Sequence, residues 1–333
     1  GTLARLPEEL ARLKCTRALV LSTPEQAAMA EAVSALIGPA AGAIFTGATM
    51  HTPVAVTERA MAIVAAEAID ATIAIGGGST TGLGKAIALR TDLPQIVVPT
   101  TYAGSEMTPI LGETAAGAKK TVRDLKVLPE TVIYDVELTL SLPAGLSATS
   151  GLNAIAHAVE GLYARDGNPV MSLMAEEGIR ALGLALPAIA RAPRDRQART
   201  HALYGAWLCG TVLGNTAMAL HHKLCHVLGG SFDLPHAATH AVVLPHAVAY
   251  NAAATPNAMA RIERALQVET AAGGLHDLAR AIGAPLALRD IGMPRDGLER
   301  AAEIASADPY ANPRPLDRAG LRALLDAAWS GER

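Results

Sequence analysis

The chain has 333 residues, of which half are apolar, and its formal net charge of −3 is made of both signs spread along the sequence. This composition supplies enough apolar side chains for two domains, and it gives no electrostatic reason to expect binding to nucleic acid or to an acidic membrane surface. Three cysteines without paired spacing argue against a disulfide framework and favour the cytoplasm, and no apolar run reaches the roughly 18 residues of a membrane span.

In the first part of the chain, short aliphatic runs alternate with helical stretches. The predicted strands cover residues 18–23, 42–45, 71–75, 95–99 and 131–135, with helices at 24–37 and 57–68. Such alternation is typical of a parallel sheet covered by helices on both faces. We therefore predict an α/β domain over residues 1–144.

After residue 144 the sequence is rich in alanine and has helical periodicity, without a convincing strand. This pattern predicts an all-α domain over residues 145–333. The predicted helices cover residues 147–164, 169–190, 195–216, 218–229, 240–252, 256–268, 273–282, 296–306 and 316–328.

A glycine cluster follows the third predicted strand and precedes a helix. Its residues are Gly76, Gly77, Gly78 and Ser79. Glycines let the backbone approach a phosphate, and free N–H groups at a helix start point toward it. The spacing is neither G-x-G-x-x-G nor a P-loop, so a plain tight turn stays open as the alternative.

A second loop with hydroxyl groups follows the fourth predicted strand. It carries Thr100, Thr101 and Ser105 at the carboxyl edge of the sheet, where ligands bind in open α/β folds. Two such loops after neighbouring strands favour a dinucleotide site, although a capped loop is the structural alternative.

Histidines gather in the second domain, where six of the ten lie between His221 and His246. Asn153 and His157 are spaced i, i+4, as are His222 and His226, so each pair shares a helix face. His236 and His240 follow. Imidazoles in such numbers indicate either a transition-metal site or acid–base and oxyanion chemistry without metal.

These features together resemble the iron-containing alcohol dehydrogenase superfamily. The resemblance is carried by Gly-Gly-Gly-Ser after a strand, Pro-Thr-Thr with Gly-Ser-Glu-x-Thr, a Leu-Pro hinge and the ordered histidines. It implies a Rossmann-like dinucleotide-binding domain and a helical catalytic domain, the dehydroquinate synthase-like fold. It also implies a homodimer, and it suggests that the family's first strands are missing before Gly1.

Within that superfamily the chain is most similar to the branch that reduces maleylacetate. The strings Met-His-Thr-Pro-Val at 50–54 and Leu-Pro-His-Ala-Ala-Thr-His at 234–240 carry this finer resemblance. It implies NADH- or NADPH-dependent reduction of the C=C bond of a small dicarboxylate, maleylacetate, to 3-oxoadipate in the degradation of aromatic compounds.

The resemblance places the family's metal ligands at Asn153, His157, His222 and His236. Asn153 stands where the family has aspartate, and a neutral amide is a poor ligand that leaves a divalent charge less compensated. We therefore expect no metal. His157, His222, His226 and His236 are expected to stabilise an enolate and protonate it, with Asn153 donating a hydrogen bond to the substrate.

Two further residues bear on the cofactor. Thr46 follows the second predicted strand, where an acidic residue usually binds the adenosine ribose and rejects a 2′-phosphate, so both NADH and NADPH are expected. Lys120 matches a family lysine near the nicotinamide, with a solvated loop lysine as the alternative. The rival functions are a metal-dependent alcohol or glycerol dehydrogenase of the same superfamily and a non-catalytic redox sensor.

Overall fold

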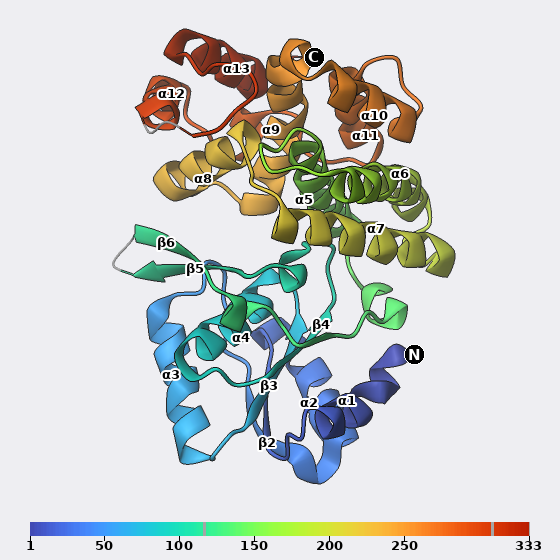
Figure 1. Cartoon of the computed structure of the whole chain (residues 1–333), viewed down its shortest axis with the longest axis vertical. Helices are drawn as coiled ribbons and strands as arrows, with labels where there is room; N and C mark the ends of the chain where they lie inside the picture. The colour runs from blue at the N-terminus through green and yellow to red at the C-terminus, as the bar shows by residue number, and fades with distance from the viewer. Residues whose placement is uncertain (116–117, 308–309, 333) are drawn as a thin grey trace. The chain divides into compact units, whose positions relative to one another are not determined.

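The structure, a computed structural model, describes residues 1–115, 118–307 and 310–332. Its contacts divide the chain into two compact units, Gly1–Leu142 and Pro143–Arg333, called here the N-terminal and C-terminal units. The predicted fold class is confirmed, because the first unit contains a parallel sheet with helices and the described part of the second is helical (Figure 1).

The N-terminal unit is built on a five-stranded sheet with the order β2-β1-β3-β4-β7, in which every neighbouring pair is parallel. Its strands are β1 (Ala18–Leu21), β2 (Ala41–Phe45), β3 (Ala71–Gly76), β4 (Gln95–Pro99) and β7 (Thr131–Val132). All residues of β1, β3 and β4 are buried, which explains why these strands read as continuous apolar runs.

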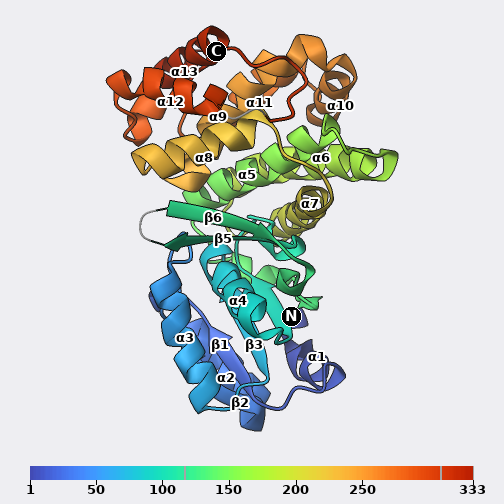
Figure 2. The same ribbon diagram turned by 60° about the vertical axis from the view of Figure 1, so that its left-hand side comes forward.

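Helices cover both faces of this sheet (Figure 2). On one face α1 (Leu6–Arg12) and α2 (Ala27–Ile37) pack against Val20 and its neighbours, and on the other α3 (Val54–Ala66) and α4 (Gly78–Thr91) pack against Leu19 and Leu21. Successive side chains of a strand point to opposite faces, so one strand supplies apolar side chains to both layers.

Three details of the N-terminal unit differ from the prediction. An antiparallel hairpin, β5 (Ile110–Ala115) with β6 (Ala118–Arg123), was not predicted. β7 keeps only two of five expected residues. Helix α3 begins at Val54 rather than at residue 57, because Pro53 takes the extended conformation of an N-cap residue.

The C-terminal unit consists of nine α-helices within its described residues. They are α5 (Ala144–Leu162), α6 (Pro169–Arg191), α7 (Arg196–Asn215), α8 (Leu220–Phe232), α9 (His236–Asn251), α10 (Pro256–Leu266), α11 (Ala271–Ala281), α12 (Leu298–Ala307) and α13 (Arg318–Ser330). Helix α5 contacts α6, α7 and α9, while α8, α9, α12 and α13 share an apolar core. Within the described ranges, no helix is long and apolar enough to cross a membrane.

Candidate functional site

The glycine cluster lies where β3 ends and α4 begins. Gly76 has a φ of +147°, and a Cβ on it would lie 2.3 Å from the hydroxyl oxygen of Thr80, so a larger residue would be strained there. Gly78 is the exposed first residue of α4, and a Cβ on it would meet nothing within 4 Å. The backbone of Gly78 therefore borders open space at a helix N-terminus, which is the arrangement that accepts a phosphate.

The loop after β4 lies against this turn. The Thr100 N–H donates to the Gly76 carbonyl at 2.9 Å, and a Cβ on Gly77 would lie 3.0 Å from the Thr101 side chain. Gln26 also donates from Nε2 to the Thr100 hydroxyl at 2.9 Å. The structure thus brings Gly76, Gly77, Thr100 and Thr101 together.

A buried lysine of α4 fixes the rest of the loop. Lys85 Nζ donates to the carbonyl oxygens of Ser105, Thr108 and Ile110 and to the Thr108 hydroxyl, at 2.6 to 2.9 Å. Burial lowers the pKa of Lys85 to about 7, and the Glu106 carboxylate opposes that shift. This lysine was not among the predicted site residues, although a lysine inside an apolar helix was a visible signal.

The remaining predicted cofactor residues stand apart from these contacts. Thr46 follows β2 at the carboxyl edge of the sheet, but β1 lies between β2 and β3. Ser79 is half-buried in the first turn of α4. Lys120 is exposed, as a solvated lysine would be, but it lies on strand β6 and not in a loop.

In the C-terminal unit, three helices bring histidines together. Helix α5 supplies His157, α8 supplies His221 and His222, and α9 supplies His236 and His240. The rings of His157 and His222 stack with centroids 5.1 Å apart, and those of His222 and His240 are 5.0 Å apart. The His236 ring lies 4.4 Å from that of His240. We call these five residues the histidine cluster.

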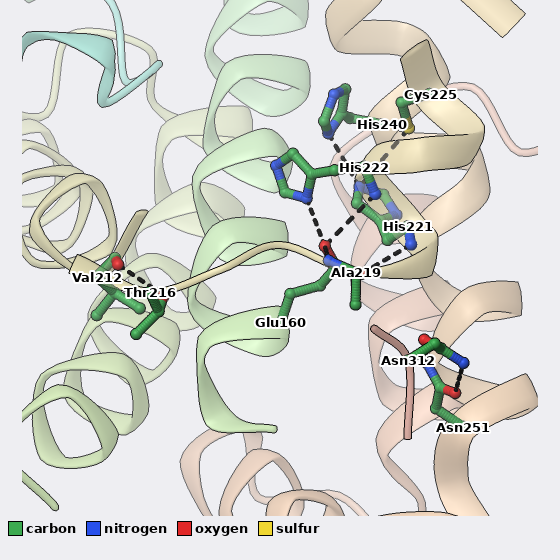
Figure 3. Close-up of polar contacts among 10 residues, drawn as sticks. All are labelled: Glu160, Val212, Thr216, Ala219, His221, His222, Cys225, His240, Asn251 and Asn312. Atoms are coloured by element: carbon green, nitrogen blue, oxygen red, sulfur yellow. Dashed lines mark hydrogen bonds and ion pairs between the residues drawn. The ribbon is translucent and has the colours of Figure 1, made fainter. Parts of the chain in front are cut away.

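Two members of the cluster are hydrogen-bonded to each other. His221 Nε2 lies 2.9 Å from His240 Nδ1, and Cys225 Sγ lies 3.7 Å from the same nitrogen of His221 (Figure 3). His221 was not among the predicted residues, although it directly precedes His222.

Glu160 was also not among the predicted residues. It is fully buried, and its Oε2 lies 2.7 Å from Nδ1 of His222. Its two oxygens also accept backbone N–H groups of Ala219 and His221 at 2.8 and 2.7 Å (Figure 3). The available signal was its position on α5, one turn after His157 and on the same face.

Burial dominates the electrostatics of the cluster. Desolvation lowers the pKa values of His157, His221 and His240 well below the usual value for histidine, and neighbouring histidines lower them further. These rings are therefore neutral at pH 7, and each keeps one N–H donor and one acceptor nitrogen.

Several buried polar atoms of the cluster and of Asn153 have no hydrogen-bond partner within the described structure. They are Asn153 Oδ1, His157 Nδ1, His221 Nδ1, His222 Nε2 and His240 Nε2. Because an unpaired buried polar group costs about 1–3 kcal/mol, such a concentration indicates a place where a polar ligand binds.

The predicted residues His236, His226 and Asn153 differ in exposure. His236 is half-buried beside His240, whereas His226 is exposed on α8 although its i, i+4 partner His222 is buried. Asn153 is buried on α5, one turn before His157.

The residues at the family's metal positions fit a divalent ion poorly. Asn153, His157, His222 and His236 include no carboxylate, and both oxygens of Glu160 already accept N–H groups. A set of neutral donors leaves the charge of the ion uncompensated. Those residues therefore support a polar organic ligand better than iron.

The structure places another possible ligand group in the same cluster. His221, Cys225 and His240 are buried and offer ligand atoms within 4.8 Å of one another. The hydrogen bond between the two histidines occupies one nitrogen of each. Burial also raises the pKa of the Cys225 thiol well above its usual value, which disfavours the thiolate that binds metal.

Comparison with known proteins gives the family. The model described as the Fe-containing alcohol dehydrogenase family, C-terminal, matches residues 147–329, and the model for iron-containing alcohol dehydrogenase matches residues 1–136. A maleylacetate reductase from Burkholderia cepacia is 58% identical over 100% of this chain and 95% of its own length.

Solved structures agree with this match. The crystal structure of maleylacetate reductase from Rhizobium sp. strain MTP-10005 has a TM-score of 0.97 at 56% identity, covering 100% of this chain and 95% of its own. An iron-containing alcohol dehydrogenase from Corynebacterium glutamicum has a TM-score of 0.95 at 43% identity, covering 100% and 93%. The chain therefore belongs to the iron-containing alcohol dehydrogenase family, in the branch that contains these maleylacetate reductases.

Proposed function

We propose that this chain reduces maleylacetate to 3-oxoadipate with NADH or NADPH, a step in the degradation of aromatic compounds. The observation that carries the proposal is the set of unpartnered polar atoms on Asn153, His157 and His222, which are buried side chains without an anion among them. The identity of 58% to a protein named maleylacetate reductase gives the substrate.

The turn after β3 and the loop after β4 support a dinucleotide site. The open backbone at Gly78 and the N-terminus of α4 can accept a diphosphate, with Ser79, Thr101 and Ser105 as nearby hydroxyl groups. When bound, the nicotinamide cofactor supplies a hydride. Thr46 provides no negative charge against a 2′-phosphate, so we propose that both cofactors are used.

The substrate is an alkene conjugated to a ketone. Hydride adds to the alkene carbon β to the ketone, and the π electrons move onto the ketone oxygen to give an enolate. An N–H of Asn153 or of a cluster imidazole stabilises that oxygen, and a histidine among His157, His222, His226 and His236 protonates the α carbon. The histidine regains its proton from solvent, so one hydride and one proton enter the product.

We propose that this reaction needs no metal. The neutral donor set supports the proposal, because a metal-dependent dehydrogenase requires a site that offsets the charge of its ion. The experiment follows NADH oxidation with maleylacetate and with simple aldehydes, and NAD+ reduction with glycerol, before and after complete removal of iron and zinc by chelation. We expect activity on maleylacetate alone, unchanged by chelation.

The second candidate is a metal-dependent alcohol or glycerol dehydrogenase. It is favoured by the 43% identity to an iron-containing alcohol dehydrogenase and by the group formed by His221, Cys225 and His240. Activity on aldehydes or glycerol that disappears with chelation and returns with iron or zinc would establish it in place of the proposal above. We further propose a cytoplasmic homodimer, which sedimentation analysis tests through the mass of the particle.

A further inference from the structure

The N-terminus of helix α8 is capped differently from those of helices α6 and α7 in the same unit. Helices α6 and α7 are capped by side chains of their own N-cap residues, Asn168 and Asp195. The N-cap residue of α8 is Ala219, which has no polar side chain. Glu160 of helix α5, 59 residues before Ala219, fills that place by accepting the N–H of His221, the second residue of α8, at 2.7 Å, and it also accepts the Ala219 N–H at 2.8 Å.

The same carboxylate also contacts a ring. Glu160 Oε2 lies 2.7 Å from Nδ1 of His222, and Oε1 accepts the backbone N–H of His221 at 2.7 Å. Figure 3 shows the carboxylate of Glu160 directed at both the start of α8 and the His222 ring. Within the described residues, each donor to this carboxylate is an N–H group, so both oxygens act as acceptors, as those of an ionised carboxylate do.

An acceptor at Nδ1 determines which nitrogen of His222 carries the proton. Nδ1 must hold a hydrogen to bond with the carboxylate, and neutral His222 therefore has its lone pair on Nε2. Nε2 is buried and has no partner in the described structure, and the ring stacks on His157 at an interplanar angle of 30°.

We propose that Glu160 is a positioning residue that fixes the Nδ1–H tautomer and the orientation of His222, and so makes Nε2 the atom that meets the substrate. The identity of the substrate rests on the proposed function, but the tautomer does not. Because Glu160 also orders the first turn of α8, one carboxylate fixes both the backbone that carries His222 and the ring itself.

The first experiment is nitrogen-15 NMR of histidine-labelled full-length protein without substrate, with the His222 signals assigned by their loss in H222Q. We expect wild-type His222 to carry its proton on Nδ1 in its neutral form. In E160Q we expect a mixture of tautomers. A wild-type His222 with its proton on Nε2 overturns the proposal, whatever the enzyme reduces.

The second experiment separates positioning from helix capping. D195A removes the side-chain cap of α7, whose carboxylate accepts the N–H groups of Gln197 and Ala198 and lies on another helix, so it is the control for lost capping. We expect E160Q to lower kcat about 10- to 100-fold, the usual loss for a residue that orients a working imidazole. D195A should keep kcat within about threefold at a comparable loss of Tm.

The third experiment asks whether Glu160 acts through His222. If it does, E160Q/H222Q reduces substrate no more slowly than H222Q, within about threefold, because the imidazole on which Glu160 acts is already absent from H222Q. Losses that multiply in the double variant overturn the proposal. If E160Q does not fold, E160D and E160D/H222Q give the same comparison, and the wild-type NMR measurement still decides the tautomer.

Discussion

The two units of this protein form their candidate binding surfaces from different chemical groups. In the N-terminal unit the turn after β3 offers backbone, and its side chains Thr80 and Thr81 bond to the Gly77 carbonyl instead of pointing outward. In the C-terminal unit the cluster offers imidazole nitrogens held between three helices. Binding at the backbone surface depends on glycines, which lack a Cβ and leave room for a ligand. Binding at the histidine cluster depends on individual side-chain nitrogen atoms.

The largest expected effect is at a single atom of the cluster. H157Q removes a buried imidazole that lies against His222, and we expect kcat with maleylacetate to fall about 1000-fold, within the range for a lost proton-transfer group. The Kd for NADH, measured by fluorescence titration, should not change. H201Q, on the exposed side of α7, is the control and should keep wild-type activity. Equal losses in both variants would refute a special role for the cluster.

Acid should unfold the C-terminal unit in particular. Burial, and then the neighbouring His276, lowers the pKa of His246 from 6.5 to about 4. The native state therefore disfavours the proton, so stability present above pH 6.5 is lost as the pH falls to about 4, by about 3 kcal/mol from this residue. At Glu106 of the N-terminal unit, burial raises the pKa, so acidification acts at that residue in the opposite direction.

The tryptophans allow this difference to be measured. Trp207 and Trp329 both lie in the C-terminal unit, so tryptophan fluorescence in denaturant titrations at pH 7 and pH 4.5 reports on that unit. We expect H246Q to lose less stability between the two pH values than the wild type does. An identical loss in both proteins would show that His246 is not protonated on unfolding in this range.

A smaller effect is expected at the end of β2. T46D places a carboxylate where the ribose of the cofactor is proposed to bind, and repulsion should raise the Kd for NADPH about 30-fold, which is about 2 kcal/mol, while NADH binding is kept. T46N has the same shape without the charge and is the control. An equal response of the two cofactors would place the adenosine ribose elsewhere.

The smallest effect tests the backbone surface. G78A adds a methyl group in open space at the start of α4, so Tm should not fall, but the Kd for NADH should rise about tenfold because the diphosphate can no longer approach closely. G230A, which also meets nothing within 4 Å, is the control in the other unit. G76A should instead lower Tm, because its φ is +147°. Unchanged NADH binding in G78A would leave this segment as a plain turn.

The strands of the parallel sheet could be predicted from the sequence better than the hairpin of β5 and β6. Strands β1, β3 and β4 are buried on both faces and appear as nearly continuous apolar runs, so pattern reading finds them. The hairpin of β5 and β6 has no such run, since Gly112, Glu113 and Thr114 are only half-buried. Its pairing depends on contacts between the two strands, which local periodicity does not contain.

The histidine cluster was predicted in part. Spacing along one helix places Asn153 with His157, but it cannot show that His221 bonds to a residue of the next helix, 19 positions away. Glu160 was missed because an acidic residue on a helix is usually solvated, and only the fold turns its carboxylate toward the start of α8. Exposure of His226 likewise follows from the packing of α8, not from its spacing.

The ammonium group of Lys85 has a practical consequence for engineering. Because the loop after β4 folds around an anchor that belongs to α4, the loop and the helix form one transferable module. A graft of residues 100–110 into another dehydrogenase would leave its carbonyl oxygens without their shared donor unless the recipient has a lysine at the equivalent place. Efforts to change the nucleotide preference of such enzymes by loop exchange should therefore move both segments together.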